Sequence, residues 1–180
     1  HLGYILGPRI NAGGRVGKCS HGAKLLLNPN PKEVFKLATE LDQFNKERQM
    51  LEKDLIKKIL AESEKKLKDP VLILHGSNWH EGIIGIVAAR LKEKFNKPTI
   101  IISIDGEIGK ASARSIVGFD IGSVIIAATQ KKILLKGGGH KMAGGFSIRI
   151  SNIEKFKEFI FRKFQTLNED LTKQKPLFVD

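Results

Sequence analysis

The chain has 180 residues, 41% of them hydrophobic, which is enough to bury a core in one medium domain or in a small domain with appendages. Its 31 Lys and Arg against 19 Asp and Glu give a formal net charge of +12. That charge favours a polyanionic partner, nucleic acid before a membrane, although a lysine-rich soluble protein has the same balance. The single cysteine, Cys19, excludes an intramolecular disulfide and argues against a cysteine-based metal site.

No apolar run reaches the roughly 18–20 residues of a membrane span, and no signal-peptide pattern opens the chain. The single cysteine fits a reducing, cytoplasmic setting, which we expect for this chain. The chain begins at His1, without a methionine, in a stretch that has the pattern of folded sequence. We expect it to be a piece of a longer protein.

Residues 1–18 are rich in glycine, and their Gly-Pro and Gly-Gly pairs signal turns. Basic residues lie among these glycines with no acidic neighbour: Arg9, Arg15 and Lys18. Guanidinium groups on a flexible backbone can bind phosphate. The simpler interpretation of these residues is a basic surface loop. A short helix is expected at residues 22–27, with its three leucines, Leu25, Leu26 and Leu27, packed inward.

A long helix is expected next. Asn30 can cap it, and Pro31 suits its first position. From Val34 to Ile59, mostly apolar residues recur every three or four positions, with Arg48 as the polar exception. This pattern predicts one amphipathic helix to about Leu67, roughly 55 Å long at 1.5 Å per residue. A helix of that length either bridges two domains or forms a coiled coil.

Two short apolar runs, Val71–His75 and Thr99–Ile104, predict strands buried on both faces. The helix predicted between them, Ile83–Phe95, makes a βαβ unit and hence a parallel pair. Ligands collect beyond the carboxyl ends of such strands, where Trp79 and His80 lie. Trp79 can stack on a base there, or it can simply cover the end of the strand.

Asp105-Gly106 is a hairpin signal that leads into residues 110–115, where alanines alternate with Ser112 and Arg114. Period-two spacing puts Ser112 and Arg114 on one face of a strand. A hydroxyl beside a guanidinium can bind phosphate. The alternative is a polar edge strand.

Five of the nine residues in Gly137–Gly145 are glycine. Such a cluster indicates positive φ angles or the close approach of another group, and successive N–H groups there can form a nest for an anion. His140 and Lys141 add a titratable donor and a positive charge. We expect a phosphate-contacting loop, but a tight turn into a strand at Phe146–Ile150, with a structural His140, fits the glycines equally well.

Two helices are expected around this stretch. Asp120 can cap the first, from Ile121 to about Gln130. Ser151 and Glu154 have the spacing of a capping box, which predicts the start of the last helix. Its apolar face consists of Phe156, Phe159, Ile160, Phe164 and Leu167. The final residues, 175–180, have the pattern of a first strand of a further element.

Four motifs in this order resemble the RecJ family of single-strand-specific exonucleases, which are DHH phosphoesterases. The matching stretches are Gly7–Arg15 (GPRINAGGR), Trp79–Ile86 (WHEGIIGI), Gly109–Gly118 (GKASARSIVG) and Gly137–Gly145 (GGGHKMAGG). The resemblance implies an α/β fold, with a small mixed sheet and flanking helices preceded by a long connecting helix. It also implies four parts: the tail of a catalytic DHH domain over 1–27, the connecting helix over 28–69, a DHH-associated substrate-binding domain over 70–174, and the start of an oligonucleotide-binding barrel at 175–180.

The activity implied by the resemblance is 5′→3′ hydrolysis of single-stranded DNA in repair and recombination. Paired Mn²⁺ or Mg²⁺ ions would activate the water. No aspartate or histidine here matches the family's metal motifs, so the resemblance places the metals upstream, in the DHH domain of the same polypeptide. We therefore expect no metal ligand in this chain and no activity from it alone. A helicase or a single-strand-binding protein is a candidate partner.

The resemblance also implies roles for individual residues. Ser112 and Arg114 would hold the terminal 5′-phosphate, with Arg15 as a further contact. The glycine stretch would approach the scissile phosphate with Gly137, Gly138, Gly139 and Lys141, and with His140 as the catalytic group. Further candidates for binding the substrate are Arg9, Asn11, Trp79, His80 and Lys110.

Two other functions fit the same residues. One is a nucleic-acid-binding module without hydrolysis, since related domains end alanyl-tRNA synthetases. The other is a DHH phosphoesterase for short oligonucleotides or cyclic dinucleotides. The GPRINAGGR motif and the long helix favour the nuclease over the first alternative. The basic charge and the continuation at 175–180 favour a longer polymer over the second.

Overall fold

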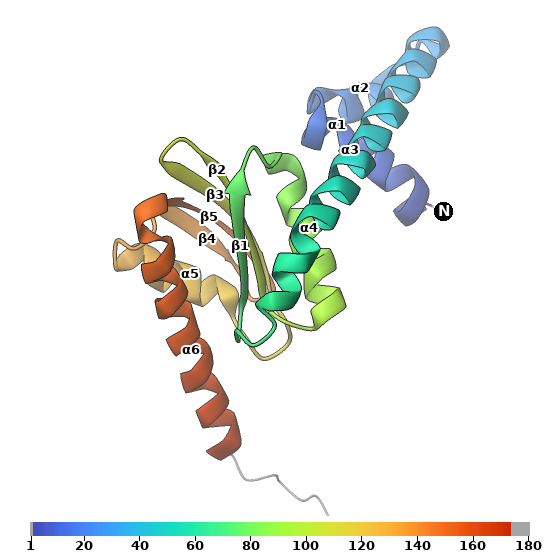
Figure 1. Cartoon of the computed structure of the whole chain (residues 1–180). Helices are drawn as coiled ribbons and strands as arrows, with labels where there is room; N and C mark the ends of the chain where they lie inside the picture. Colours follow the sequence, from blue (N-terminus) through green and yellow to red (C-terminus); the bar gives the residue numbers. More distant parts are fainter. Residues whose placement is uncertain (1, 174–180) are drawn as a thin grey trace, which may run out of the picture. The chain divides into compact units, whose positions relative to one another are not determined.

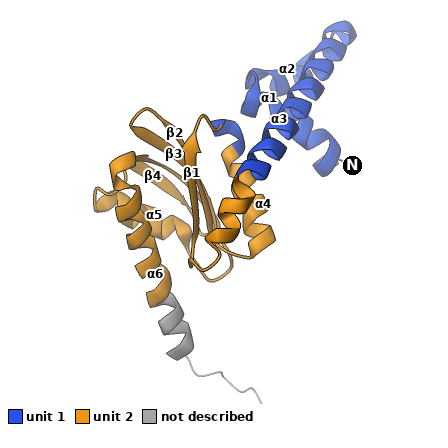
Figure 2. Ribbon diagram, viewed as in Figure 1, with its two compact units in different colours: residues 1–58, 80–83 blue, residues 59–79, 84–180 orange. Residues whose placement is uncertain are grey.

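The computed structural model describes residues 2–173, and their side chains from Gly3 to Thr166. The predictions for Leu167 and for residues 175–180 fall outside what is described. The chain forms two compact units (Figure 2), one of residues 1–58 and 80–83 and the other of residues 59–79 and 84–180.

The first unit is helical. It contains a π-helical turn, Leu2–Leu6, followed by α1 (Gly7–Val16), α2 (Ser20–Leu27) and most of α3 (Pro31–Lys65). The prediction of turns in residues 7–15 is wrong, because the proline stands in the first turn of α1, where its missing N–H costs nothing. The glycines instead permit close packing. A methyl group on Gly13 would lie 2.8 Å from the carbonyl oxygen of Lys18.

The second helix, α2, forms as predicted, but its leucines do not all pack inward. Leu25 is half-buried, whereas Leu26 and Leu27 are 69% and 82% exposed. The inward positions of α2 belong to His21 and Gly22, and a methyl group on Gly22 would lie 2.9 Å from Cγ2 of Ile10. Close contact with α1 at a glycine turns the following leucines outward.

The long helix α3 begins as predicted, since the Asn30 side chain accepts a hydrogen bond from the N–H of Lys32 (3.0 Å). Its buried stripe contains Leu41, Leu55 and Ile59, but the middle of the stripe is polar. Arg48 donates from Nη1 to Glu52 (2.9 Å) and from Nη2 to Asn45 (3.1 Å), and all three residues are buried. Arg48 is therefore the centre of a polar cluster rather than a single exception.

The second unit is built on a sheet of five strands within the described residues, in the order β1-β2-β3-β5-β4 (Figure 1). The strands are β1 (Leu72–Ser77), β2 (Thr99–Asp105), β3 (Ile108–Arg114), β4 (Lys136–His140) and β5 (Ala143–Arg149). The first two are parallel and are joined by α4 (Glu81–Phe95), while the other pairs are antiparallel. The mixed sheet, the βαβ unit and the hairpin at Gly106, where φ is +56°, confirm the predictions.

Helices cover both faces of this sheet (Figure 1). One face packs on α5 (Ile121–Gln130) and α6 (Ile153–Lys173), the latter preceded by a 3-10 turn, Ile150–Asn152. The core on this side includes Ile100, Ile102, Ala113, Ile125, Phe146, Phe156 and Ile160. On the other face, α4 lies over the β1–β2 side and buries Val87, Ala88 and Leu91. No helix among the described residues is both long and apolar enough to cross a membrane.

The glycine stretch is a β-hairpin, not the expected loop. Its first glycines lie in β4, its turn is Lys141-Met142, and its last glycines lie in β5. Among the residues described, the glycines with positive φ are Gly106 and Gly118, so the stretch is not a left-handed nest. Close approach explains part of it: a methyl group on Gly137 would lie 2.7 Å from Cγ2 of Ile125, and one on Gly144 would lie 2.5 Å from Cδ1 of the same side chain.

Candidate functional site

The register of β3, β5 and β4 sets side chains in rows across the sheet, because directly paired residues of neighbouring strands point to the same face. We use "open face" for the face of these three strands that points away from α5 and α6. It carries three rows: Arg114–Ala143–His140, Ser112–Gly145–Gly138, and Lys110–Ser147–Lys136. The two motifs that the sequence separates by more than twenty residues thus share one surface.

Ser112 and Arg114 lie on the same face of β3, as predicted, and contact one another. Arg114 donates from Nη1 to Oγ of Ser112 (3.1 Å) and to the backbone oxygen of Ala113 (2.8 Å). Helix α4 borders this pair at Gly85. A methyl group there would lie 2.9 Å from Oγ of Ser112 and 3.0 Å from Nη2 of Arg114, so a larger residue at this position would displace these two side chains.

His140 is the last residue of β4 and is exposed. It shares a row with Arg114, and adjacent strands are about 4.8 Å apart, so the two Cα atoms are about 10 Å from one another. Between them the floor is made of Ala143 and, one row on, of Gly145 and Gly138. Around these small residues the imidazole, the guanidinium and the hydroxyl of Ser112 are the groups that can hydrogen-bond to an anion.

The tip of the hairpin is anchored to the start of α5. The backbone oxygen of Lys141, itself exposed in the turn, accepts a hydrogen bond from the N–H of Ile121 (3.2 Å). Asp120 caps α5 as predicted, accepting from the N–H of Ser123 (3.0 Å), and this bond holds the pKa of the carboxyl below its ordinary value. The hairpin that carries His140 is thereby fixed to a capped helix.

The candidates in the first unit have different surroundings. Arg15 lies in the last turn of α1 and donates from Nη1 to the backbone oxygen of Gly82 (3.2 Å). Arg9 is paired with Asp42 on α3, Nε to Oδ1 at 2.7 Å, and Asn11 is exposed. Lys46, followed by Arg9, holds the pKa of Asp42 below its ordinary value. The guanidinium of Arg9 thus contacts α3.

The loop after β1 places Trp79 and His80 in structural contacts. The indole of Trp79 lies over Gly76, where a methyl group would come within 2.6 Å of Cζ2, and its backbone oxygen accepts from Oγ of Ser103. Nδ1 of His80 accepts the N–H of Gly82 (3.1 Å) at the start of α4. The half-buried indole therefore covers the end of the strand.

The open face contains two residues that the sequence analysis did not single out for a site, Lys136 and Ser147, with Gly85 at its border. The signal for Lys136 was present, because Lys136, Gly138 and His140 alternate as they do in a strand. This alternation was not used, because the stretch was interpreted as a loop, and in a loop the spacing of residues does not place them on one face.

Metal ligands do not gather in the part of the chain that the structure describes. No group of three or more His, Cys, Asp or Glu side chains lies close enough to hold a metal ion there. The described residues therefore do not fit a metal centre of the kind that hydrolyses phosphodiesters, which needs several such ligands on each ion.

Comparison with known proteins agrees with these features. Residues 68–166 match the model of the DHHA1 domain. The single-stranded-DNA-specific exonuclease RecJ of Haemophilus influenzae is 37% identical over 165 residues, which cover 87% of this chain and 28% of that protein. For RecJ of Bacillus subtilis the identity is 36% over 155 residues, covering 84% of this chain and 20% of that protein.

The fold agrees with solved structures as well. The crystal structure of RecJ from Thermus thermophilus in complex with Mn²⁺ matches with a TM-score of 0.81 at 29% identity, over 91% of this chain and 24% of that one. The chain spans 20% to 29% of the length of the curated relatives it matches. The chain thus belongs to the DHHA1 domain family and, over most of its length, is similar to the RecJ exonucleases.

Proposed function

We propose that this chain is the substrate-holding part of a 5′→3′ single-strand-specific DNA exonuclease and that its open face binds the phosphates of the strand. The observation that carries the proposal is the row Arg114–Ala143–His140 beside Ser112, which brings two RecJ-like motifs together over a floor of small residues. The similarity to RecJ supports single-stranded DNA as the substrate.

The terminal phosphate is bound by Arg114 and Ser112. The hydroxyl of Ser112 accepts the Arg114 bond with a lone pair, so it can donate its own hydrogen to a phosphate oxygen. The guanidinium adds charge-assisted bonds, which are stronger than neutral ones. His140, at the other end of the row, approaches the scissile phosphate and donates an N–H to one of its nonbridging oxygens, where negative charge develops during hydrolysis. Lys141 adds positive charge for the same strand.

We place the metal ions, Mn²⁺ or Mg²⁺, on a DHH domain of the same polypeptide outside residues 1–180. The proposal is supported by the RecJ of Thermus thermophilus, which has been crystallised with each ion, and by the chain's match to only 20% to 29% of the length of its RecJ relatives. The whole enzyme would act by a two-metal mechanism in the cytoplasm, in DNA repair and recombination, with a helicase or single-strand-binding protein as partner.

Binding of 5′-phosphorylated and unphosphorylated single-stranded DNA to the 180-residue chain tests the proposal. Charge-assisted bonds contribute about 1.5–3 kcal/mol, so we expect a preference of roughly 10- to 100-fold for the phosphorylated end. Arg114→Ala should remove most of this preference, whereas Lys155→Ala, an exposed charge on α6, should leave it unchanged. Equal affinity for both ends in the unaltered chain would refute the role of Ser112 and Arg114.

The same titration with Mn²⁺ present tests where the metals bind. We expect binding without cleavage. Cleavage that a chelator stops would contradict our placement of the metal ions on another domain.

A further inference from the structure

The third row of the open face, Lys110–Ser147–Lys136, lies outside the terminal phosphate site. Lys110 and Lys136 are each paired with Ser147, one from β3 and one from β4, so all three side chains point to the same face. Neighbouring strands are about 4.8 Å apart, which puts the two lysine Cα atoms about 10 Å from one another across the serine. The long, flexible stems of both lysines can bring their ammonium groups to one point above it.

The surface is hollowed at this row. A shallow pocket of about 400 Å³ at this row is lined by both lysines, Gly145 and Ser147, and by Ala111, Gly137 and Phe146. The lysines are exposed, and Ser147 is 8% exposed between them. Two ammonium groups on either side of a hydroxyl cannot pair with each other, but together they can bind an anion.

The row lies at a defined distance from the terminal phosphate site. Along β3, Lys110 is two residues from Ser112 and four from Arg114, which is about 7 Å and about 14 Å at roughly 3.4 Å per residue. The intervening row holds Gly145 and Gly138. Space is open above Gly138, and a methyl group on Gly145 would meet only the backbone oxygen of Ala111, at 3.4 Å. A ligand can therefore lie directly on the backbone between the two charged rows.

We propose that Lys110, Ser147 and Lys136 form a second phosphate-binding position, for an internal phosphate of the strand whose 5′ end is held by Ser112 and Arg114. This inference rests on the proposed function. Phosphates of a stacked strand repeat every 3.4 Å or so along its axis, so about 7–14 Å corresponds to about two to four nucleotides, and to fewer if the strand is extended. The single strand thus runs along β3 from the end at Arg114 toward Lys110, and a dinucleotide is too short to use both positions when stacked.

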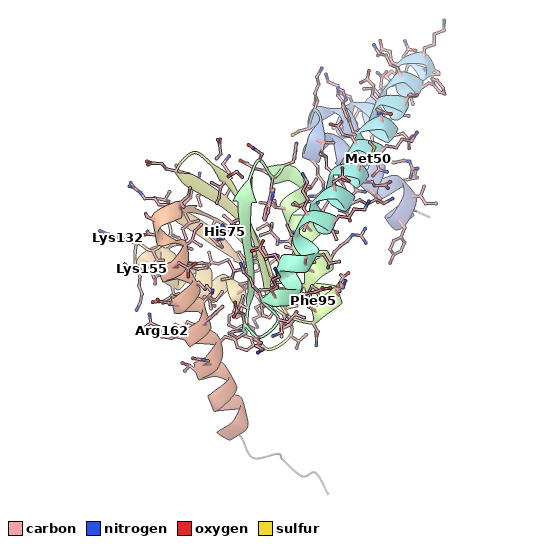
Figure 3. All side chains as sticks on the ribbon, in the orientation of Figure 1. Met50, His75, Phe95, Lys132, Lys155 and Arg162 are labelled. Carbon is pink, nitrogen blue, oxygen red and sulfur yellow. The ribbon has the colours of Figure 1, made fainter. Side chains whose placement is uncertain are left out.

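The test compares two ligands of different length, a 5′-phosphorylated thymidine dinucleotide and the matching octanucleotide, at several salt concentrations. The variant is Lys110→Ala combined with Lys136→Ala, two exposed positions where folding should be unaffected. The control removes the same charge from α6, on the other side of the sheet, by Lys155→Ala with Lys163→Ala; Lys155 is labelled in Figure 3.

We expect the double variant on the open face to weaken octanucleotide binding by roughly fivefold to tenfold. The slope of log affinity against log salt should become about 1.4 units less steep, from two contacts at about 0.7 each. Dinucleotide binding and the preference for a 5′-phosphate should not change. The α6 control should change neither ligand's affinity by a comparable amount.

Three outcomes are decisive. An octanucleotide affinity that falls no more than in the α6 control would overturn the second position. An equal loss for the dinucleotide would also overturn it, since the lysines would then belong to the terminal site. A loss confined to the octanucleotide, in a chain that shows no preference for a 5′-phosphate, would support the second position while refuting the terminal role of Arg114.

Discussion

At the scale of single residues, the glycines of the hairpin serve two different purposes. Those that point toward α5 are in contact: a methyl group on Gly137 would lie 2.7 Å from Cγ2 of Ile125 and 2.8 Å from Cβ of Phe146. Gly138, which points to the open face, has no such contact, since a methyl group on it would meet nothing within 4 Å. Packing therefore explains Gly137 but gives no reason for Gly138.

This contrast predicts opposite results for two neighbouring substitutions. Gly138→Ala should fold normally and gain about 0.4–1 kcal/mol in free energy of unfolding, because alanine restricts the unfolded chain. It should weaken binding of single-stranded DNA, because its methyl group occupies the space where the strand meets the backbone. Gly137→Ala should instead lose about 1–3 kcal/mol by overpacking.

Thermal or denaturant unfolding and DNA titration of both variants check these expectations. Gly14→Ala, another glycine with open space around its Cβ position, is the matched control for binding. If Gly138→Ala bound DNA as the unaltered chain does, the strand would not lie against the backbone of β4.

At the scale of elements, the middle of α3 is held by charges rather than by apolar contacts. The guanidinium of Arg48 and the carboxylate of Glu52 are 2.9 Å apart, with side chains only 10% and 5% exposed. Removing one partner of a buried pair leaves the other charge without compensation, whereas replacing both with apolar groups often costs little.

We therefore expect Glu52→Ala to lower the free energy of unfolding by about 3–5 kcal/mol. The double replacement Arg48→Met with Glu52→Leu should lose much less than the single variant. Denaturant unfolding of the three proteins measures both effects. A double variant as unstable as Glu52→Ala would show that the pair contributes through more than its charges.

The elements also show what the sequence could and could not predict. The βαβ unit, the cap at Asp120 and the shared face of Ser112 and Arg114 follow from local periodicity and capping, and the structure has all three. The hairpin at Gly137–Gly145 did not follow, because glycine has weak strand propensity and its cluster suggested a loop. The polar cluster on α3 was missed beyond Arg48, because burial of Asn45 and Glu52 depends on partners that no local pattern reveals.

At the scale of the whole molecule, a net charge of +12 leads us to expect some affinity for any polyanion. The more informative measurement is therefore how the affinity for DNA depends on salt concentration. With about four phosphates contacted on a single strand, the slope of log affinity against log salt should be about −3. Titrations between low and moderate salt measure it. A flat response would contradict nucleic-acid binding altogether.

The position of β4 in the sheet has one more consequence, for how copies of the chain behave together. As an edge strand of the described sheet, β4 leaves a row of backbone groups without a neighbouring strand, and such rows can recruit another chain. This edge is five residues long, its three central residues are glycines, and a lysine begins it. Short, charged, weakly strand-forming edges resist extension by a second strand. The short, glycine-rich strand that we propose as part of the binding face thus also has an edge that resists aggregation.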